Sequence, residues 1–166
     1  MKSFPKRFYH NPIQFFQEIA HLLTHAPRAR VRDSISRAFR ERLMLTVTSV
    51  NACRYCARFH ALVALTTGIS RAEIEQILDG ELVHAPEREL VALLYAQHWA
   101  ETDAQPDPAA RAKLVATYGD DLARAIEYVL RTIRVGNLLG NTFDYILDRL
   151  SFGRLGSPHK HSTTTG

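Results

Sequence analysis

Both cysteines of the chain lie within one short segment, together with a histidine. Two residues separate Cys53 from Cys56, and three separate Cys56 from His60. Residues three and four apart share one face of a helix, so a helix through this segment would place the two thiols together and His60 one turn beyond Cys56. A thiol pair at this spacing can close a disulfide, and its thiolate form is a nucleophile.

The surroundings of this segment favour thiolate chemistry. We predict a helix from Asn51 to Gly68, which places both cysteines in its first turn. The free N–H groups and the dipole of a helix stabilise an anion at that end. Arg54 and Arg58 add positive charge nearby. The segment is therefore predicted to carry a reactive thiol.

Other interpretations of the cysteines stay open at this point. A zinc site would use both thiolates and His60, but it needs a fourth ligand, and the sequence contains no second cluster of cysteine and histidine. A c-type haem requires a histidine directly after the second cysteine, where Ala57 stands. Inert thiols in a hydrophobic core are the third alternative, because free cysteine is often buried.

Periodic apolar residues and capping signals predict helices along the whole chain. Asn11 is a good N-cap before Pro12, and Ser70 with Glu73 forms a capping box. The predicted helices run from Asn11-Pro12 to Pro27, from Asp33 or Ser34 toward Asn51, from Asn51 to Gly68, from Ser70 to Asp79-Gly80, from Pro86 to about Glu101, from Asp107-Pro108 to Tyr118-Gly119, and from Asp120 or Asp121 to Leu150.

The last predicted helix contains an interruption. Gly136 and Gly140, together with two asparagines, predict a bend or a break there. From Ser151 onward the composition predicts a flexible tail. No strand signal and no internal repeat competes with the helical pattern, and the fold class is therefore all-α with short connections.

Composition excludes several classes of protein. The 166 residues fit one domain, and they are 46% hydrophobic and 23% charged, which is typical of a soluble globular protein and rules out disorder throughout. No apolar stretch approaches the roughly 20 residues of a membrane-spanning helix. The N-terminus lacks the apolar region of a signal peptide, so we expect a cytoplasmic protein with no membrane partner.

Basic residues gather in one part of the chain. The net charge is +4, and six arginines lie between positions 28 and 42. They are Arg28, Arg30, Arg32, Arg37, Arg40 and Arg42. No nucleic-acid motif accompanies them. We interpret them as a solvated helix face or a subunit contact, and we expect no nucleic-acid partner.

Eleven residues separate Glu41 from Cys53, two separate Cys53 from Cys56, and three separate Cys56 from His60. This spacing resembles the active-site motif of the AhpD-like proteins of the carboxymuconolactone decarboxylase superfamily. Two further stretches are similar to family sequences. They are Gly68-Ile69-Ser70 followed by Glu73-Ile74, and the residues from Asn137 to Asp144. The resemblance covers roughly Ser34 to Leu150.

This resemblance implies a helical bundle of about six or seven helices that assembles into homo-oligomers, often trimers or hexamers. It indicates one AhpD-like domain over residues 1–150, followed by the tail at 151–166. Residues 1–32 would form an extra N-terminal helix, either peripheral or packed between subunits.

The resemblance also implies a thiol-dependent hydroperoxide reductase or disulfide reductase. Glu41 would act as a base through His60 and deprotonate Cys56, the peroxidatic cysteine, while Cys53 would resolve the oxidised intermediate. From the residues alone, the more N-terminal cysteine of such a pair is often the nucleophile. We follow the family because His60 is placed to serve Cys56. No bound cofactor and no metal is expected, and the reductant would be an external thiol or lipoyl group.

Two other functions remain alternatives. The chain could sense redox state or bind a partner without turnover, or it could act on lactone acids as a decarboxylase of the same scaffold. The thiol pair argues against the decarboxylase, which would not need it.

Several polar or aromatic residues outside the motif are assigned structural roles or none. We expect His98 and Trp99 to pack in the fold. Asn137, Asn141 and Asp144 are expected to form hydrogen bonds across subunits or to cap a helix break. His159 and His161 are assigned no role.

Overall fold

The computed structural model describes residues 4–27, 31 and 33–155. Within these ranges the chain forms seven helices and no strand. They are α1 (Pro12–Thr24), α3 (Arg37–Asn51), α4 (Arg54–Thr66), α5 (Arg71–Leu78), α6 (Glu87–Glu101), α7 (Pro108–Tyr118) and α8 (Asp120–Leu150). The predicted all-α fold is confirmed.

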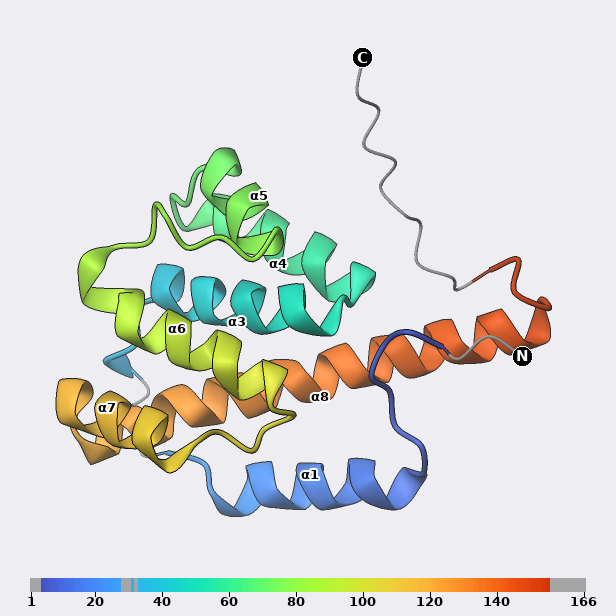
Figure 1. Ribbon diagram of the computed structural model, residues 1–166, viewed down its shortest axis with the longest axis horizontal. Helices are drawn as coiled ribbons and strands as arrows, with labels where there is room; N and C mark the ends of the chain where they lie inside the picture. The colour runs from blue at the N-terminus through green and yellow to red at the C-terminus, as the bar shows by residue number, and fades with distance from the viewer. Residues whose placement is uncertain (1–3, 28–30, 32, 156–166) are drawn as a thin grey trace.

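Helix α3 occupies the middle of the bundle. It packs against α8 and α6 on one side and against α4 and α5 on the other, while α1 lies along the far side of α8 (Figure 1). The main core forms where α3, α6, α7 and α8 meet, and its fully buried side chains include Leu43, Trp99, Leu114 and Leu130. The predicted packing role of Trp99 is confirmed.

Helices α1, α3 and α5 each begin at an asparagine or serine whose side chain accepts a backbone N–H. Asn11 accepts from the amide of Gln14, and Ser70 accepts from that of Glu73, so both predicted starts are confirmed. Helix α3 begins later than expected, because Ser36 rather than Asp33 or Ser34 serves as its N-cap. These caps satisfy N–H groups that have no partner within the helix.

Helix α8 runs for 31 residues without interruption, so the break predicted near Gly136 and Gly140 is wrong. Tertiary contacts on both sides outweigh the weak helix propensity of glycine. Although α8 is long, no helix in the described ranges is apolar enough to cross a membrane.

Helix α1 leaves several large apolar side chains exposed. Ile13, Phe16 and Leu23 are each more than 60% exposed, and no residue of α1 is buried. The half-buried Phe15 and Ile19 lie on its inner side. This arrangement fits a peripheral helix.

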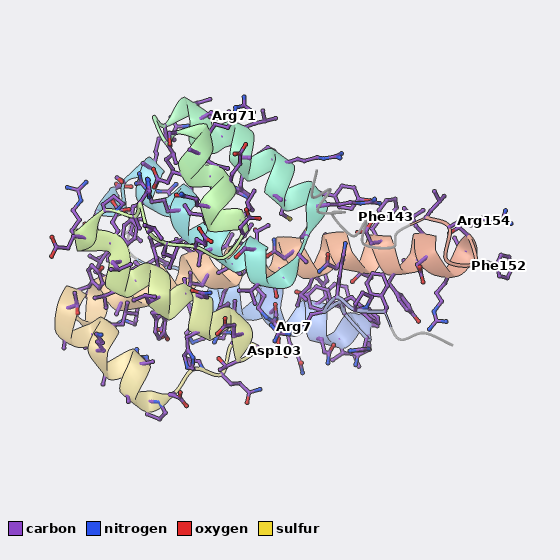
Figure 2. All side chains as sticks on the ribbon, turned by 45° about the horizontal axis from the view of Figure 1, so that its top comes forward. Arg7, Arg71, Asp103, Phe143, Phe152 and Arg154 are labelled. Carbon is purple, nitrogen blue, oxygen red and sulfur yellow. The ribbon has the colours of Figure 1, made fainter. Side chains whose placement is uncertain are left out.

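Residues 4–10, the N-terminal strap, cross α8 before α1 begins (Figure 1). The ring of Phe8 stacks on Tyr145 of α8 with centroids 4.2 Å apart. Arg7 lies beside Asp103, just after the end of α6 (Figure 2). The strap therefore joins the ends of two core helices.

The arginine cluster is only partly a solvated face. Arg28, Arg30 and Arg32 lie outside the described residues. Arg42 is 12% exposed in its side chain and forms ion pairs with Glu73 of α5 and Glu89 of α6. For Arg42 the predicted solvated face is wrong, because its guanidinium group holds three helices together.

Candidate active site

The two cysteines lie at the sharp junction between α3 and α4. Asn51 is the last residue of α3, and Ala52 takes a left-handed conformation with φ 54°. Cys53 then serves as the N-cap of α4, which begins at Arg54. The predicted helix start at Asn51 is wrong, because the left-handed turn at Ala52 ends one helix and redirects the chain into the next. A non-glycine residue in this conformation is strained, and such strain concentrates at functional sites.

The two thiols are in direct contact. Their sulfur atoms lie 3.0 Å apart, and both cysteines are free thiols. The sulfur of Cys53 also accepts the backbone N–H of Cys56 at 3.4 Å. Cys53 is only 1% exposed, whereas Cys56 is partly exposed. The two thiols therefore lie together as their spacing predicts, and Cys56 is the accessible one.

The contact between the sulfurs separates their acidities. The pKa of Cys53 is lowered to about 7, chiefly by the hydrogen bond that the Cys56 thiol donates to its sulfur. The backbone N–H groups of Cys56 and Tyr55 and the charge of Lys6 act in the same direction, whereas burial opposes the shift. The pKa of Cys56 is raised by that same hydrogen bond and by burial, although a bond to Asn137 opposes the shift. The pair thus shares one proton, with the negative charge resting mainly on Cys53.

Two glycines of α8 make room for the sulfur atoms. A Cβ at position 140 would lie 2.7 Å from the sulfur of Cys53 and 3.3 Å from the ring of Tyr55. A Cβ at position 136 would lie 3.9 Å from the sulfur of Cys56, which is an ordinary contact. Sequence reasoning missed this role, although glycines four residues apart in a strongly amphipathic helix mark one face.

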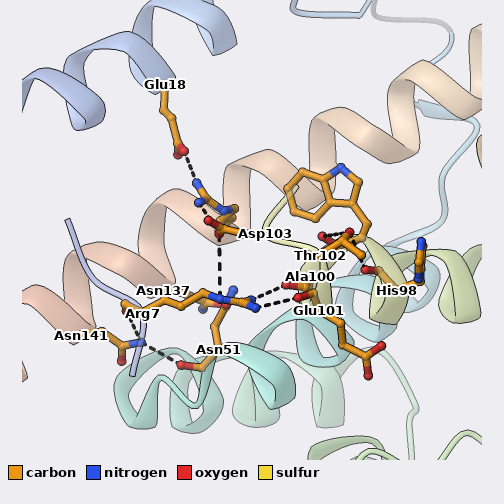
Figure 3. Close-up of polar contacts among 12 residues, drawn as sticks. Arg7, Glu18, Asn51, His98, Ala100, Glu101, Thr102, Asp103, Asn137 and Asn141 are labelled. Carbon is orange, nitrogen blue, oxygen red and sulfur yellow. Dashed lines mark hydrogen bonds and ion pairs between the residues drawn. The ribbon is translucent and has the colours of Figure 1, made fainter. Parts of the chain in front are cut away.

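Buried amides connect α3 to α8 behind the thiols. Asn51 donates to Asn137 at 3.2 Å, and Asn137 donates to Thr48 at 3.1 Å. Asn141 donates to the carbonyl oxygen of Asn51 at 2.7 Å (Figure 3). Asn137 and Asn141 are fully buried. The expectation that these residues bond across subunits or cap a helix break is wrong, because their partners lie within the same chain and the helix is continuous.

Asp144, one turn further along α8, also has its ion-pair and hydrogen-bond partners within the chain. It lies 2.9 Å from Lys6 and 2.7 Å from Arg54, and it accepts a hydrogen bond from the Tyr55 hydroxyl at 2.9 Å. Its carboxylate is fully buried. Asp144 therefore fixes the first turn of α4 against α8 and the strap.

Glu41 and His60 form the second half of the site. Glu41 of α3 is 7% exposed, and its carboxylate lies 2.7 Å from Nδ1 of His60 on α4. His60 follows Cys56 by one turn of α4. Among the described residues no hydrogen bond joins His60 to either sulfur, so a proton passing between them needs a water molecule or a bound substrate.

No group of three or more His, Cys, Asp and Glu side chains in the described part of the chain is arranged to hold a metal ion. The other histidines lie away from the thiols. His98 of α6 accepts the backbone N–H of Asp107 at 3.2 Å, while His159 and His161 lie outside the described residues.

Exposed apolar side chains lie on α4 and α8 near the thiol pair. Tyr55 and Phe59 project from α4, and Phe143 projects from the neighbouring surface of α8 (Figure 2). Phe59 and Phe143 are more than half exposed, and the ring of Phe143 contacts that of Tyr55 with centroids 6.0 Å apart. An apolar molecule could therefore approach Cys56 over this surface.

Comparison with known proteins identifies a matching family. The model of the carboxymuconolactone decarboxylase family matches residues 17–98. This stretch contains α3 and α4 and with them all four motif residues, Glu41, Cys53, Cys56 and His60. No curated protein and no solved structure matches the chain significantly.

Proposed function

The chain belongs to the carboxymuconolactone decarboxylase family, and from that premise we propose that it is a thiol-dependent reductase of organic hydroperoxides. The proposal depends on one observation above all. Two free thiols lie 3.0 Å apart at the start of a helix, and the pKa of one of them is lowered to about 7. A thiolate is therefore present near neutral pH beside a second thiol that can form a disulfide with it.

We propose that Cys56 attacks the peroxide. Cys53 carries most of the negative charge but is buried, whereas Cys56 is accessible. Transfer of the shared proton across the 3.0 Å contact from Cys56 to Cys53 places the thiolate on Cys56. Its sulfur then bonds to the terminal peroxide oxygen, the O–O bond breaks, and Cys56 becomes a sulfenic acid.

The pair of Glu41 and His60 supplies the proton that the leaving group needs. The alkoxide that departs from the peroxide takes a proton from the imidazolium of His60 and leaves as an alcohol. Glu41, 2.7 Å from the ring nitrogen, stabilises the imidazolium before this step. Proton transfer of this kind typically accelerates a reaction by about 10²–10⁴-fold.

Cys53 completes the cycle. Its sulfur attacks the sulfenic acid of Cys56, a disulfide forms, and the hydroxyl group leaves as water after taking the thiol proton. An external dithiol then supplies two electrons and two protons by thiol–disulfide exchange, which restore the shared proton of the thiol pair and the proton of His60.

The apolar surface around Cys56 favours alkyl and aryl hydroperoxides over hydrogen peroxide. Tyr55, Phe59 and Phe143 would contact the organic part of the substrate. The same exposed surface is available for a subunit contact, and the trimer or hexamer that the resemblance implies stays a prediction, which analytical ultracentrifugation would test.

A count of free thiols tests the proposal. Addition of an equimolar amount of cumene hydroperoxide to the reduced protein should remove both thiols, and dithiothreitol should restore them. With excess peroxide and dithiol, an enzyme continues to turn over, whereas a redox sensor stops after one oxidation. Absence of thiol loss would contradict the proposed function.

Two variants test the separate roles of the cysteines. Cys53→Ser should stop at the sulfenic acid, which dimedone labels. Cys56→Ser should lose peroxide reduction, because the remaining sulfur is buried. Full turnover by Cys56→Ser would show that Cys53 makes the attack.

A further inference from the structure

Three residues of the N-terminal strap bond to α8 beside the thiol site. Lys6 forms an ion pair with Asp144 at 2.9 Å. The carbonyl oxygen of Arg7 accepts a hydrogen bond from Asn141 at 2.9 Å, and the amide of Tyr9 donates to the side chain of Thr142 at 3.0 Å. These contacts join residues more than 130 positions apart in the chain.

The side chain of Arg7 ties the same strap to the end of α6. It donates to the carbonyl oxygens of Ala100 and Glu101 and lies 4.0 Å from Asp103 (Figure 3). Anchors on both α6 and α8 hold the strap in one position. Lys6 is therefore held against α8, and its side chain is only 6% exposed.

The strap continues the hydrogen-bond network that supports the cysteines. Asn141 bonds to the strap through Arg7 and to α3 through the carbonyl oxygen of Asn51. Asn51 in turn bonds to Asn137, which contacts the Cys56 thiol. Displacement of the strap would remove a partner from the fully buried amide of Asn141, and such a group is costly to leave unpaired.

Positive charge exceeds negative charge at the start of α4. The buried carboxylate of Asp144 is balanced by two cations, Lys6 from the strap and Arg54 from α4, which leaves one positive charge in surplus. Tyr55 donates to the same carboxylate, and its ring packs at Gly140 beside the Cys53 sulfur. Of the two cations, Arg54 is 37% exposed, whereas Lys6 is 6% exposed, so the charge of Lys6 is the one that water screens little.

We propose that Lys6 is a positioning residue of the thiol site, which fixes the start of α4 through Asp144 and stabilises the anion of Cys53 with its positive charge. This inference rests on the proposed redox use of the thiols. The family match begins at residue 17 and thus does not include the strap. On this proposal the strap is part of the active site.

The ionisable groups of the thiol site come from four elements. They are Lys6 of the strap, Glu41 of α3, Arg54, Tyr55, Cys56 and His60 of α4, and Asp144 of α8. Cys56 lowers the pKa of Cys53 by its hydrogen bond, and Lys6 lowers it by its charge. Loss of the Lys6 charge and loss of the Asp144 charge must therefore shift this pKa in opposite directions. A purely structural role would disturb the site in the same direction in both variants.

The experiment is a pH titration of the thiolate ultraviolet absorbance in the full-length reduced protein. Lys6→Met should raise the pKa of Cys53 by about 0.5–1 unit, since it removes a nearby opposite charge. The thiolate fraction below the pKa should then fall about 3–10-fold. Lys6→Arg should restore the wild-type value. Lys113→Met, which removes the same charge from the exposed side of α7, should leave the titration unchanged.

Asp144→Asn should shift the pKa of Cys53 in the opposite direction to Lys6→Met. This variant keeps the proposal testable if Lys6→Met fails to fold. It leaves Lys6 and Arg54 without their carboxylate and should lower the pKa of Cys53. A titration of Lys6→Met that matches Lys113→Met, or a rise in pKa in Asp144→Asn, would overturn the proposal. Because the titration needs no peroxide, it tests Lys6 even if the protein does not turn over hydroperoxides.

Discussion

Gly140 of α8 lies directly against the sulfur of Cys53. A Cβ at this position would come within 2.7 Å of the sulfur atom, closer than real side chains approach. Four residues earlier, the same face of α8 contains Gly136, where a Cβ would have a normal contact with Cys56. The two glycines therefore differ in function, although both lie inside one continuous helix.

Alanine at the two positions should have opposite effects. Gly140→Ala forces Cys53 and Tyr55 to move, and overpacking of this kind costs about 1–3 kcal/mol. Because alanine also improves helix propensity by about 1 kcal/mol, the net loss of stability is expected to be modest. The displacement of Cys53 should nevertheless slow disulfide formation after peroxide treatment. Urea unfolding and free-thiol counts measure the two effects.

Gly136→Ala is the matched control. Its Cβ fits, so the gain in helix propensity should raise the unfolding free energy by about 0.5–1 kcal/mol. Peroxide-dependent thiol loss should continue. Equal behaviour of the two variants would show that the sulfur contact at Gly140 does not decide the difference.

The helices and the thiol pair could be predicted from local signals. Asn11 and Ser70 mark helix starts by their side-chain chemistry, and the spacing of Cys53 and Cys56 is enough to bring them together on one turn. The junction before Cys53 could not be predicted, because alanine has no preference for the left-handed conformation that Ala52 adopts. Tertiary structure imposes that turn.

The supporting residues of the site were harder to interpret. Gly140 and Asn141 suggest a helix break when α8 is considered alone, yet each has a partner on α4, α3 or the strap. Glu41 was assigned through the family spacing, since nothing local indicates that this glutamate is buried against His60. Contacts between residues distant in the chain have no signal in local sequence patterns.

The ion pairs of Arg42 should be important for stability. Its guanidinium group lies 2.6 Å from Glu73 and 3.1 Å from Glu89, and all three side chains are at most 12% exposed. Arg42→Met leaves both carboxylates without this partner and should lower the unfolding free energy by about 3–5 kcal/mol in urea titrations. Arg124→Met removes an exposed arginine paired with Asp120 and should cost less than about 1 kcal/mol. Similar losses in both variants would contradict this assignment.

Glu41 and Glu89 allow a test of the proton relay with matched burial. They are 7% and 4% exposed, but only Glu41 contacts His60. Glu41→Gln should lower peroxide turnover by about 10²–10⁴-fold, because the imidazolium loses its carboxylate. Glu89→Gln should destabilise the fold through Arg42 while the turnover per folded molecule stays at the wild-type level. Steady-state kinetics together with circular dichroism separate the two effects, and unchanged turnover in Glu41→Gln would remove the relay from the mechanism.

The shared proton of the thiol pair predicts how stability depends on pH. The pKa of Cys53 is lowered from 9.0 to about 7 in the folded state, so its contribution to stability is present above the unfolded value and is lost as the pH falls through the folded value. The pKa of Cys56 is raised, so its contribution is present below the unfolded value and is lost at higher pH.

Between about pH 6 and about pH 8.5, the Cys53 contribution should dominate the pH dependence. The difference in Tm between the reduced wild-type protein and Cys53→Ser should therefore increase as the pH rises through this range. Cys56→Ala removes the thiol that donates to Cys53, so the pKa of Cys53 should rise toward its ordinary value of 9.0. Thermal unfolding followed by circular dichroism at several pH values measures the first effect, and thiolate absorbance measures the second. A Tm difference that stays constant or decreases with pH would show that the two sulfurs do not share a proton in the folded protein.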